Sequence, residues 1–347
     1  MKEEAKPWYG VLEVVIRGAV PLMLVLLLAL AMPIQAAEER KVIPVGRAVG
    51  IKLFSDGVVV VGTSEVDTEQ GQVNPAKACG LKEGDIITHI NATEVDSIEE
   101  ISAILQQLEG EPMSIRAIRR EQPIQFTARA VLCSADGAYK LGAWIRDSMA
   151  GIGTVTFYDP DTGMFGALGH GINDVDTALL MPLEQGSILS ASVAGVQRGK
   201  AGKPGVLHGV FDTEHVLGIL NANTTGGIFG LSEGTGWGEG EALPLAKAEE
   251  IRTGTAYILS NVEGDRVEQY AVEISRLRPH EKGDLRDCLI TVTDERLLER
   301  TGGIVQGMSG SPILQNGKLV GAVTHVLVND PTRGYGIFIE NMLEAAG

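Results

Sequence analysis

The sequence has few aromatic residues and no excess of positive charge. Phenylalanine, tryptophan and tyrosine make up only 5 % of the 347 residues, while 44 are glycine. This composition favours short strands and tight turns over large helical cores. The formal net charge of −16 argues against a nucleic-acid partner, which needs a basic face. The sequence has neither a cluster of metal-ligating residues nor a phosphate-binding loop, so we expect no cofactor and no metal.

Cysteine is also scarce. Cys79, Cys133 and Cys288 are odd in number and widely spaced, which excludes a disulfide framework and a zinc site of the usual paired spacing. We expect buried thiols that pack like small apolar side chains.

Long hydrophobic runs are absent except for one near the N-terminus. Residues 18–34 contain no charge, whereas residues 1–17 are polar and of mixed charge. A run of about 17 residues is compatible with a signal peptide or a membrane anchor. Cleavage after Ala36 would release a soluble protein, and without cleavage residues 1–37 would tether the rest. In both cases the chain after Glu38 lies outside the cytoplasm.

Residues 41–132 have the pattern of a small domain of strands and two helices. Two apolar runs joined at Asp56-Gly57 predict a hairpin, and a short helix, the strand-forming GDIITHIN and a longer helix capped by Ser97 follow. This order resembles PDZ domains, which bind an extended peptide beside a glycine-containing loop that receives its terminal carboxylate. By this resemblance, Val49, Gly50 and Ile51 would form that loop.

The hexapeptide GMSGSP, residues 307–312, predicts a serine nucleophile. It resembles the nucleophile loop of chymotrypsin-like peptidases, with Ser309 at the reactive position and Met308 in place of an aspartate. The N–H groups of Gly307 and Ser309 can form an oxyanion hole because glycine allows the required backbone angles. A strand follows, and its residues Thr324, His325 and Val326 would pair with the substrate backbone.

A serine nucleophile needs a neighbouring base. His170 ends a strand-like run in a Gly-His-Gly turn about 140 residues before Ser309, the order found in chymotrypsin-like enzymes, and we predict that it is the base. His325 is an alternative because its strand passes close to the nucleophile loop. The remaining candidates lie near polar loops: His208, His215 and His280.

The chain also resembles the S55 peptidase family of endospore-forming bacteria. The resemblance rests on GALGHGI around His170 and on the long segment from TDERLLER through GMSGSP to GYGIFIENML. It implies that His170 and Ser309 are catalytic and that Asp294 completes a triad. It also implies an exported regulatory protease that cleaves a membrane-anchored regulator, and itself, in the space between forespore and mother-cell membranes. That cleavage would trigger processing of a sigma-factor precursor.

The spacing of residues along the sequence does not decide which residue is the third member of the triad. Asp294 precedes Ser309 by only 15 residues, whereas Asp212, 42 residues after His170, has the usual chymotrypsin-like spacing. Only the family resemblance selects Asp294.

The whole pattern predicts a mostly β protein with a small α+β part. We expect a PDZ-like domain at 41–132 followed by a double β-barrel serine peptidase domain at 141–347, with a protein or peptide substrate and a peptide segment bound by the PDZ-like part. The alternative is a catalytically inactive PDZ-type binding or scaffold protein of the spore envelope.

Overall fold

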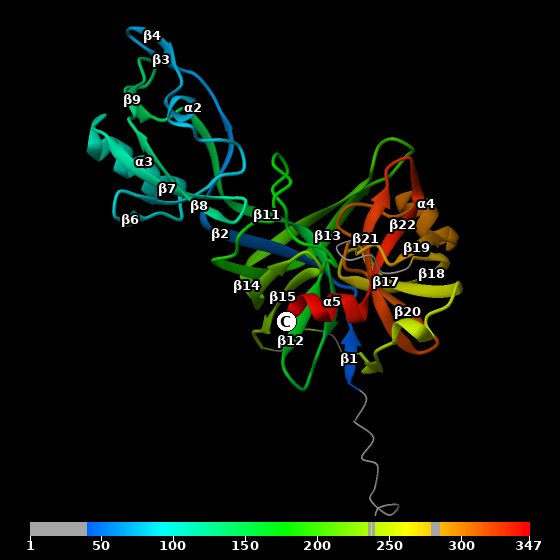
Figure 1. Ribbon diagram of the computed structural model, residues 1–347. Helices are drawn as coiled ribbons and strands as arrows, with labels where there is room; N and C mark the ends of the chain where they lie inside the picture. Colours follow the sequence, from blue (N-terminus) through cyan, green and yellow to red (C-terminus); the bar gives the residue numbers. More distant parts are fainter. Residues whose placement is uncertain (1–39, 235–236, 238–239, 279–284) are drawn as a thin grey trace, which may run out of the picture. The chain divides into compact units, whose positions relative to one another are not determined.

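The computed structural model describes residues 40–347, except 235–236, 238–239 and 279–284 (Figure 1). The chain divides into two units, Met1–Arg40 and Lys41–Gly347. The apolar segment at 18–34 and its predicted role in export lie outside the described residues. Among the residues that are described, no helix has the length and apolar character needed to cross a membrane.

A first β-barrel is closed by pairing between two long strands. β2 pairs with β11 on one edge and with β13 on the other, and the ring continues from β11 through β12, β15 and β14 back to β13. The strands of the ring are β2 (Ala48–Thr63), β11 (Ala143–Tyr158), β12 (Met164–Ala167), β13 (Gln185–Gln197), β14 (Val206–Thr224) and β15 (Gly227–Ser232). Short strands β1 (Lys41–Pro44) and β16 (Leu243–Pro244) extend it beside β11.

The second barrel is closed in the order β17-β18-β19-β22-β21-β20 and is drawn from yellow to red in Figure 1. Its strands are β17 (Gly254–Glu263), β18 (Arg266–Leu277), β19 (Cys288–Val292), β20 (Pro312–Gln315), β21 (Lys318–Leu327) and β22 (Asp330–Phe338). Alternating apolar side chains fill its centre, among them the fully buried Ile258, Ile274 and Ile290. The two barrels confirm the predicted mostly β, chymotrypsin-like double-barrel fold.

Three short helices accompany the barrels: η1 (Ala248–Glu250), α4 (Glu295–Thr301) and α5 (Ile339–Ala346). α5 joins the barrels because its buried Met342 packs in one cluster with Phe157 and Phe229 of the first barrel and Ile337 of the second.

The PDZ domain has its own core around Ile87, Ile101, Leu105 and Ile115. Its elements are β3 (Val66–Thr68), β4 (Gly71–Val73), α2 (Pro75–Cys79), β5 (Ile86–Ile90), β6 (Thr93–Glu94), α3 (Ile98–Leu108), β7 (Met113–Arg119), β8 (Gln122–Ala128), β9 (Val131–Leu132) and β10 (Tyr139–Lys140). The predicted cap of α3 is confirmed: the Ser97 hydroxyl accepts from Glu100 N–H at 3.2 Å and the Glu100 carboxylate accepts from Ser97 N–H at 3.1 Å.

The PDZ core lies between two strands of the first barrel in chain order. β2 leads from the barrel into it, and β11 leads back. The two strands pair from Ala143 opposite Thr63 to Thr154 opposite Ala48. The hairpin predicted at Asp56-Gly57 is therefore wrong. These residues lie within β2, at a bulge where residues 55–58 face the single residue Asp147.

The cysteines lie apart from one another, and all three are free. Cys133 and Cys288 are buried and Cys79 is partly buried. Burial raises the pKa of Cys288 to about 12, so this thiol stays protonated and contributes to the barrel core as a small apolar side chain.

Candidate active site

The nucleophile loop lies between α4 and β20 and is held by β11. Thr154 donates its N–H to the carbonyl of Ser309 at 2.9 Å and its hydroxyl to the carbonyl of Gly307 at 2.7 Å. Gly310 has φ +96°, and a Cβ there would lie 1.9 Å from the Thr154 carbonyl oxygen. Only glycine fits so close an approach, which explains the glycine directly after the serine.

The loop presents two N–H groups of the kind required for an oxyanion hole. Gly307 adopts φ +99°, and neither its N–H nor that of Ser309 has a hydrogen-bond acceptor within the described residues. Between them, Met308 is fully buried in the second-barrel core. The side chain that replaces the aspartate of digestive enzymes is thus a core residue.

Ser309 points its hydroxyl at β21 in this conformation. Its Oγ donates to the carbonyl of Thr324 at 2.7 Å, so the hydroxyl proton is not shared with a histidine. A rotation of about 120° about χ1 takes a serine from one staggered rotamer to the next. Another staggered rotamer would release Oγ from the Thr324 carbonyl.

His170 follows β12 in the Gly-His-Gly turn. Its Nδ1 lies 2.8 Å from the carbonyl oxygen of Gly171. Because a carbonyl can only accept, this contact places the proton on Nδ1 and leaves Nε2 as the basic nitrogen. Burial lowers the pKa of His170 below its ordinary value of 6.5, so the imidazole is neutral at pH 7.

His170 and Ser309 line one cavity of about 410 Å³. Gly307, Thr324, His325 and Val326 line it too, so the structure brings the predicted base, nucleophile, oxyanion loop and cleft strand together. The rings of His170 and His325 lie 5.0 Å apart and are tilted by 37°. Desolvation, His170 and Arg286 lower the pKa of His325.

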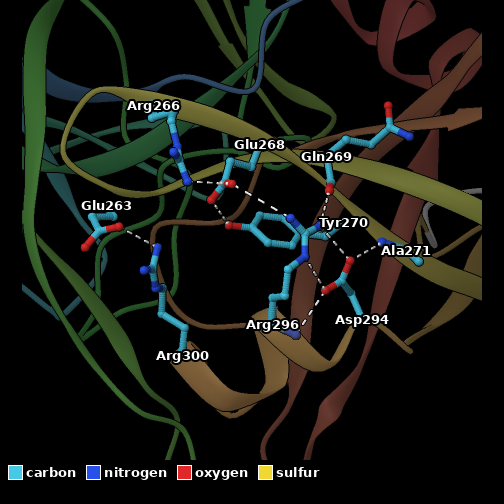
Figure 2. A network of polar contacts seen from close by, with 9 residues as sticks. All are labelled: Glu263, Arg266, Glu268, Gln269, Tyr270, Ala271, Asp294, Arg296 and Arg300. Atoms are coloured by element: carbon cyan, nitrogen blue, oxygen red, sulfur yellow. Dashed lines mark hydrogen bonds and ion pairs between the residues drawn. The ribbon is translucent and has the colours of Figure 1, made fainter.

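Asp294 does not reach this cavity. It caps α4, where its carboxylate accepts from the N–H groups of Arg296 and Ala271 at 3.0 and 3.2 Å. It also pairs with the Arg296 guanidinium at 2.9 Å, which holds the pKa of this carboxyl below its usual value. Figure 2 shows these contacts in a network with Glu268 and Tyr270. In this structure the Asp294 carboxylate therefore binds Ala271 and Arg296 and makes no contact with His170, so its place in a triad stays a prediction.

Asp212, the alternative triad acid, does not contact His170 either. It lies on β14, with half of its side chain exposed, and its carboxylate lies 2.6 Å from Nδ1 of His215. It lines a different hollow, beside Arg47 and Ser190. In the described part of the chain the His170 imidazole contacts neither aspartate, and its Nδ1 is bound by the Gly171 carbonyl instead.

The prediction for the PDZ loop is wrong. Val49, Gly50 and Ile51 lie in the middle of β2, paired with β11 on one edge and with β13 on the other. No edge is left there for a peptide. Close packing explains the glycine at position 50, because a Cβ there would lie 2.7 Å from the ring of Phe211.

The groove of the PDZ domain is lined by a different glycine-containing loop. A cavity of about 470 Å³ lies between α3 and the start of β11, where Leu141, Gly142 and Ala143 meet the helix residues Ile101 and Leu105. Gly142 has φ +70°. The tripeptide Leu-Gly-Ala at 141–143 resembles Val-Gly-Ile at 49–51. The prediction selected 49–51 because in PDZ domains this loop is expected near the start of the domain.

Comparison with known protein families shows the family of this chain. A family model described as SpoIVB peptidase S55 matches residues 137–343, more than half of the chain. The chain belongs to this family. As a member of the S55 family it is a serine endopeptidase, and a PDZ-domain model matches residues 72–119.

The zinc metalloprotease RasP of Shouchella clausii is 40 % identical over 58 residues, which are 17 % of this chain and 14 % of RasP. The chain thus covers only a small part of that relative.

Similar solved structures were also found. The Rv3671c protease, known from M. tuberculosis, has 15 % identity over 56 % of this chain and 82 % of its own in the inactive form, with a TM-score of 0.32. The HtrA-type protease AlgW with a tripeptide has 15 % identity, coverage of 56 % and 54 %, and a TM-score of 0.34. The PDZ domain of an SdrC-like protein from Listeria monocytogenes has 22 % identity, coverage of 26 % and 87 %, and a TM-score of 0.22.

Proposed function

We propose that Ser309 and His170 form a catalytic dyad that cleaves an extended polypeptide in the cleft between the two barrels. The observation that carries this proposal is the single cavity lined by both side chains and by the loop with two free N–H groups. The resting serine first turns away from the Thr324 carbonyl. Nε2 of His170 then takes its proton while Oγ attacks the scissile carbonyl carbon.

The N–H groups of Gly307 and Ser309 stabilise the oxyanion that forms. His170 returns the proton to the leaving amine, the C–N bond breaks, and the acyl part stays as an ester on Ser309. Water, deprotonated by the same imidazole, hydrolyses this ester and restores both residues. Thr324, His325 and Val326 on β21 pair with the substrate backbone on the acyl side.

In this mechanism the carbonyl of Gly171 fills the role that an aspartate has in a triad. It fixes the tautomer of His170 through the 2.8 Å contact with Nδ1. A carbonyl carries no full charge, so it stabilises the imidazolium less than a carboxylate does. We therefore expect a slow enzyme, which suits a regulatory protease that cuts few substrates.

The side chains around the cleft indicate the substrate. None of the residues that line it is charged, and most are aliphatic or glycine, including Met149, Ile152, Ile304 and Val326. Burying an unpaired charge there would be costly. We expect cleavage beside small or medium-sized apolar side chains.

We further propose an exported regulatory role in sporulation. The protease would cut a membrane-associated protein, and itself, between forespore and mother cell, and so trigger processing of a sigma-factor precursor. Membership of the S55 family, a PDZ groove for recruitment and the apolar N-terminal segment support this role.

Two experiments test the proposal. A fluorophosphonate probe should label the wild-type enzyme and not Ser309→Ala, while Ser311→Ala, a serine two residues further on in the same loop, serves as a matched control that keeps labelling. Equal labelling of all three would refute the assignment of Ser309. A reporter fused after Glu38 should be active outside the cytoplasm, and a cytoplasmic reporter would refute export.

A further inference from the structure

One strand lines both the PDZ groove and the catalytic cleft. Ala143, Trp144 and Ile145 at the start of β11 line the groove beside α3. Residues 149–152 of the same strand line the cleft. Thr154, directly beyond, holds the nucleophile loop through its two hydrogen bonds. β11 thus runs without interruption from the PDZ groove to the catalytic cleft.

This strand has a free edge between the two sites. One edge of β11 pairs with β2 throughout, from Ala143 to Thr154. On the other edge, pairing with β12 starts only at Val155, and no described strand pairs with residues 143–152. An unpaired edge beside an apolar groove is the surface to which an extended peptide adds as a strand.

The loop that precedes β11 is suited to a terminal carboxylate. The carbonyls of Leu141 and Gly142 accept hydrogen bonds from Ala76 and Ser64 at 2.8 Å. The N–H groups of Leu141 and Gly142 have no acceptor within the described residues. Free N–H groups on a glycine turn bind anions such as a carboxylate.

The polarity of the strand fits one peptide in both sites. A peptide with its carboxylate at Gly142 that extends along β11 must run antiparallel to the strand. Its N-terminal direction then leads towards Thr154 and the nucleophile. A substrate cut at Ser309 has its leaving part on the C-terminal side of the scissile bond, so that part leads back along β11 towards the groove. Binding of the carboxylate at Gly142 and cleavage at Ser309 therefore both require a peptide that runs antiparallel to β11.

Two residues of this strand, Asp147 and Arg146, fix it to the sites that it joins. The carboxylate of Asp147 accepts from the N–H of Ile98 at the start of α3 at 2.9 Å. Arg146 pairs with Asp174, whose side chain is fully buried, and with Asp176. Both aspartates follow His170 in the same segment. The middle of β11 is therefore tied to the helix of the groove and to the segment that carries the base.

We propose that one substrate tail occupies both sites, so that the PDZ groove measures the distance from the scissile bond to a free C-terminus. This inference rests on the proposed activity of Ser309. Residues 143–152 span about 30 Å at roughly 3.3 Å per residue. The released fragment, which keeps the original carboxylate, should therefore be about ten residues long.

The test uses a peptide library of mixed sequence, made once with free C-termini and once with amidated C-termini. Mass spectrometry of the products gives the distance from each cleavage to the C-terminus. With free carboxylates we expect a cluster at about 8 to 12 residues, in line with the length of the strand. With amidated peptides we expect the cluster to disappear. A flat distribution in both libraries would overturn the proposal.

Two substitutions on α3 give a matched pair. Ser102 is exposed and lines the groove, whereas Ala103 is exposed and does not. Ser102→Trp should fill the groove and lower cleavage at the clustered distance by at least about tenfold, the equivalent of 1.4 kcal/mol. Ala103→Trp should behave as wild type. If Ser102→Trp kept the cluster, the groove would not hold the tail.

Fluorophosphonate labelling of Ser309 separates the two possible failures. A labelled enzyme that cuts at random distances refutes only the measuring role of the groove. An enzyme that neither cuts nor takes the label refutes the proposed activity itself. Ser102→Trp should label like wild type, because residue 102 does not line the catalytic cleft.

Discussion

The cleft around Ser309 and the polar network around Asp294 differ in chemistry although only 15 residues separate the two side chains in sequence. The cleft contains two neighbouring histidines, and no carboxylate lines it. The network contains Asp294, Glu268 and Arg296, with no histidine among its partners (Figure 2). Asp294 thus caps helix α4, while the His170 imidazole is held by the backbone carbonyl of Gly171.

The largest expected effect concerns the base. His170→Ala should lower the turnover number by several orders of magnitude, on the scale of deletions in a catalytic unit. Turnover of an apolar peptide by purified protein measures it, with circular dichroism to confirm folding. His325→Ala is the matched control, since this second histidine of the cleft has no assigned proton transfer, and we expect it to lose much less. Full activity of His170→Ala would reject the dyad.

The next effect concerns stability. Asp294→Ala removes the cap of α4 and the acceptor for the Ala271 N–H, which should lower the free energy of unfolding by about 1–3 kcal/mol. Denaturant unfolding measures the loss. Asp212→Ala, at an exposed site, should change it by less than about 0.5 kcal/mol. An equally stable Asp294→Ala protein would show that the network is not structural.

The nucleophile loop and the base could be predicted from the sequence, whereas the role of the acid could not. GMSGSP predicted a nucleophile loop because glycines, a serine and a proline at fixed positions encode backbone geometry, and the Gly-His-Gly turn predicted His170. The structure places Ser309 and His170 in one cavity. The acid could not be found in the same way. Any acidic residue at a helix start serves equally as a cap, and Asp294 has that local role.

The fold class was predicted from the sequence, but the order in which the chain connects the strands was not. Alternating strands and glycine turns predicted barrels, and the capped helix predicted the PDZ domain. The path of β2 was missed because Asp56-Gly57 has the sequence of a hairpin turn and lies instead at a bulge. Whether a strand continues through such a dipeptide depends on its distant partner β11, which no local pattern reveals. The same error placed the predicted carboxylate loop at Gly50, which lies within β2 and is paired on both edges.

A smaller effect is expected from pH. His170 must be neutral to act as base, and its pKa lies below 6.5 because of burial. Activity should therefore decline at low pH, as the imidazole becomes protonated, with a midpoint below 6.5. The acid limb of kcat/KM measures this. A midpoint above 6.5 would indicate a carboxylate next to the imidazole, which raises a histidine pKa.

The smallest effect is expected at the alternative acid. Asp212→Asn keeps the shape of an exposed side chain bound to His215, so kcat/KM should stay within about twofold of wild type, the scatter of neutral surface changes. Steady-state kinetics with the same peptide measure this. A loss of about 10⁴, typical of a triad acid, would restore Asp212 to the catalytic unit.

The central claim is that His170 activates Ser309 without a carboxylate, and the rate of fluorophosphonate labelling tests it most directly. Labelling reports the reactivity of Ser309 with no need for a known substrate, and it can be normalised to the folded fraction of each variant. We expect Asp294→Asn to be labelled within about twofold of the wild-type rate and His170→Ala at least about 10³ times more slowly. If folded Asp294→Asn lost labelling as severely as His170→Ala, the claim would be contradicted, and Asp294 would belong to a catalytic triad.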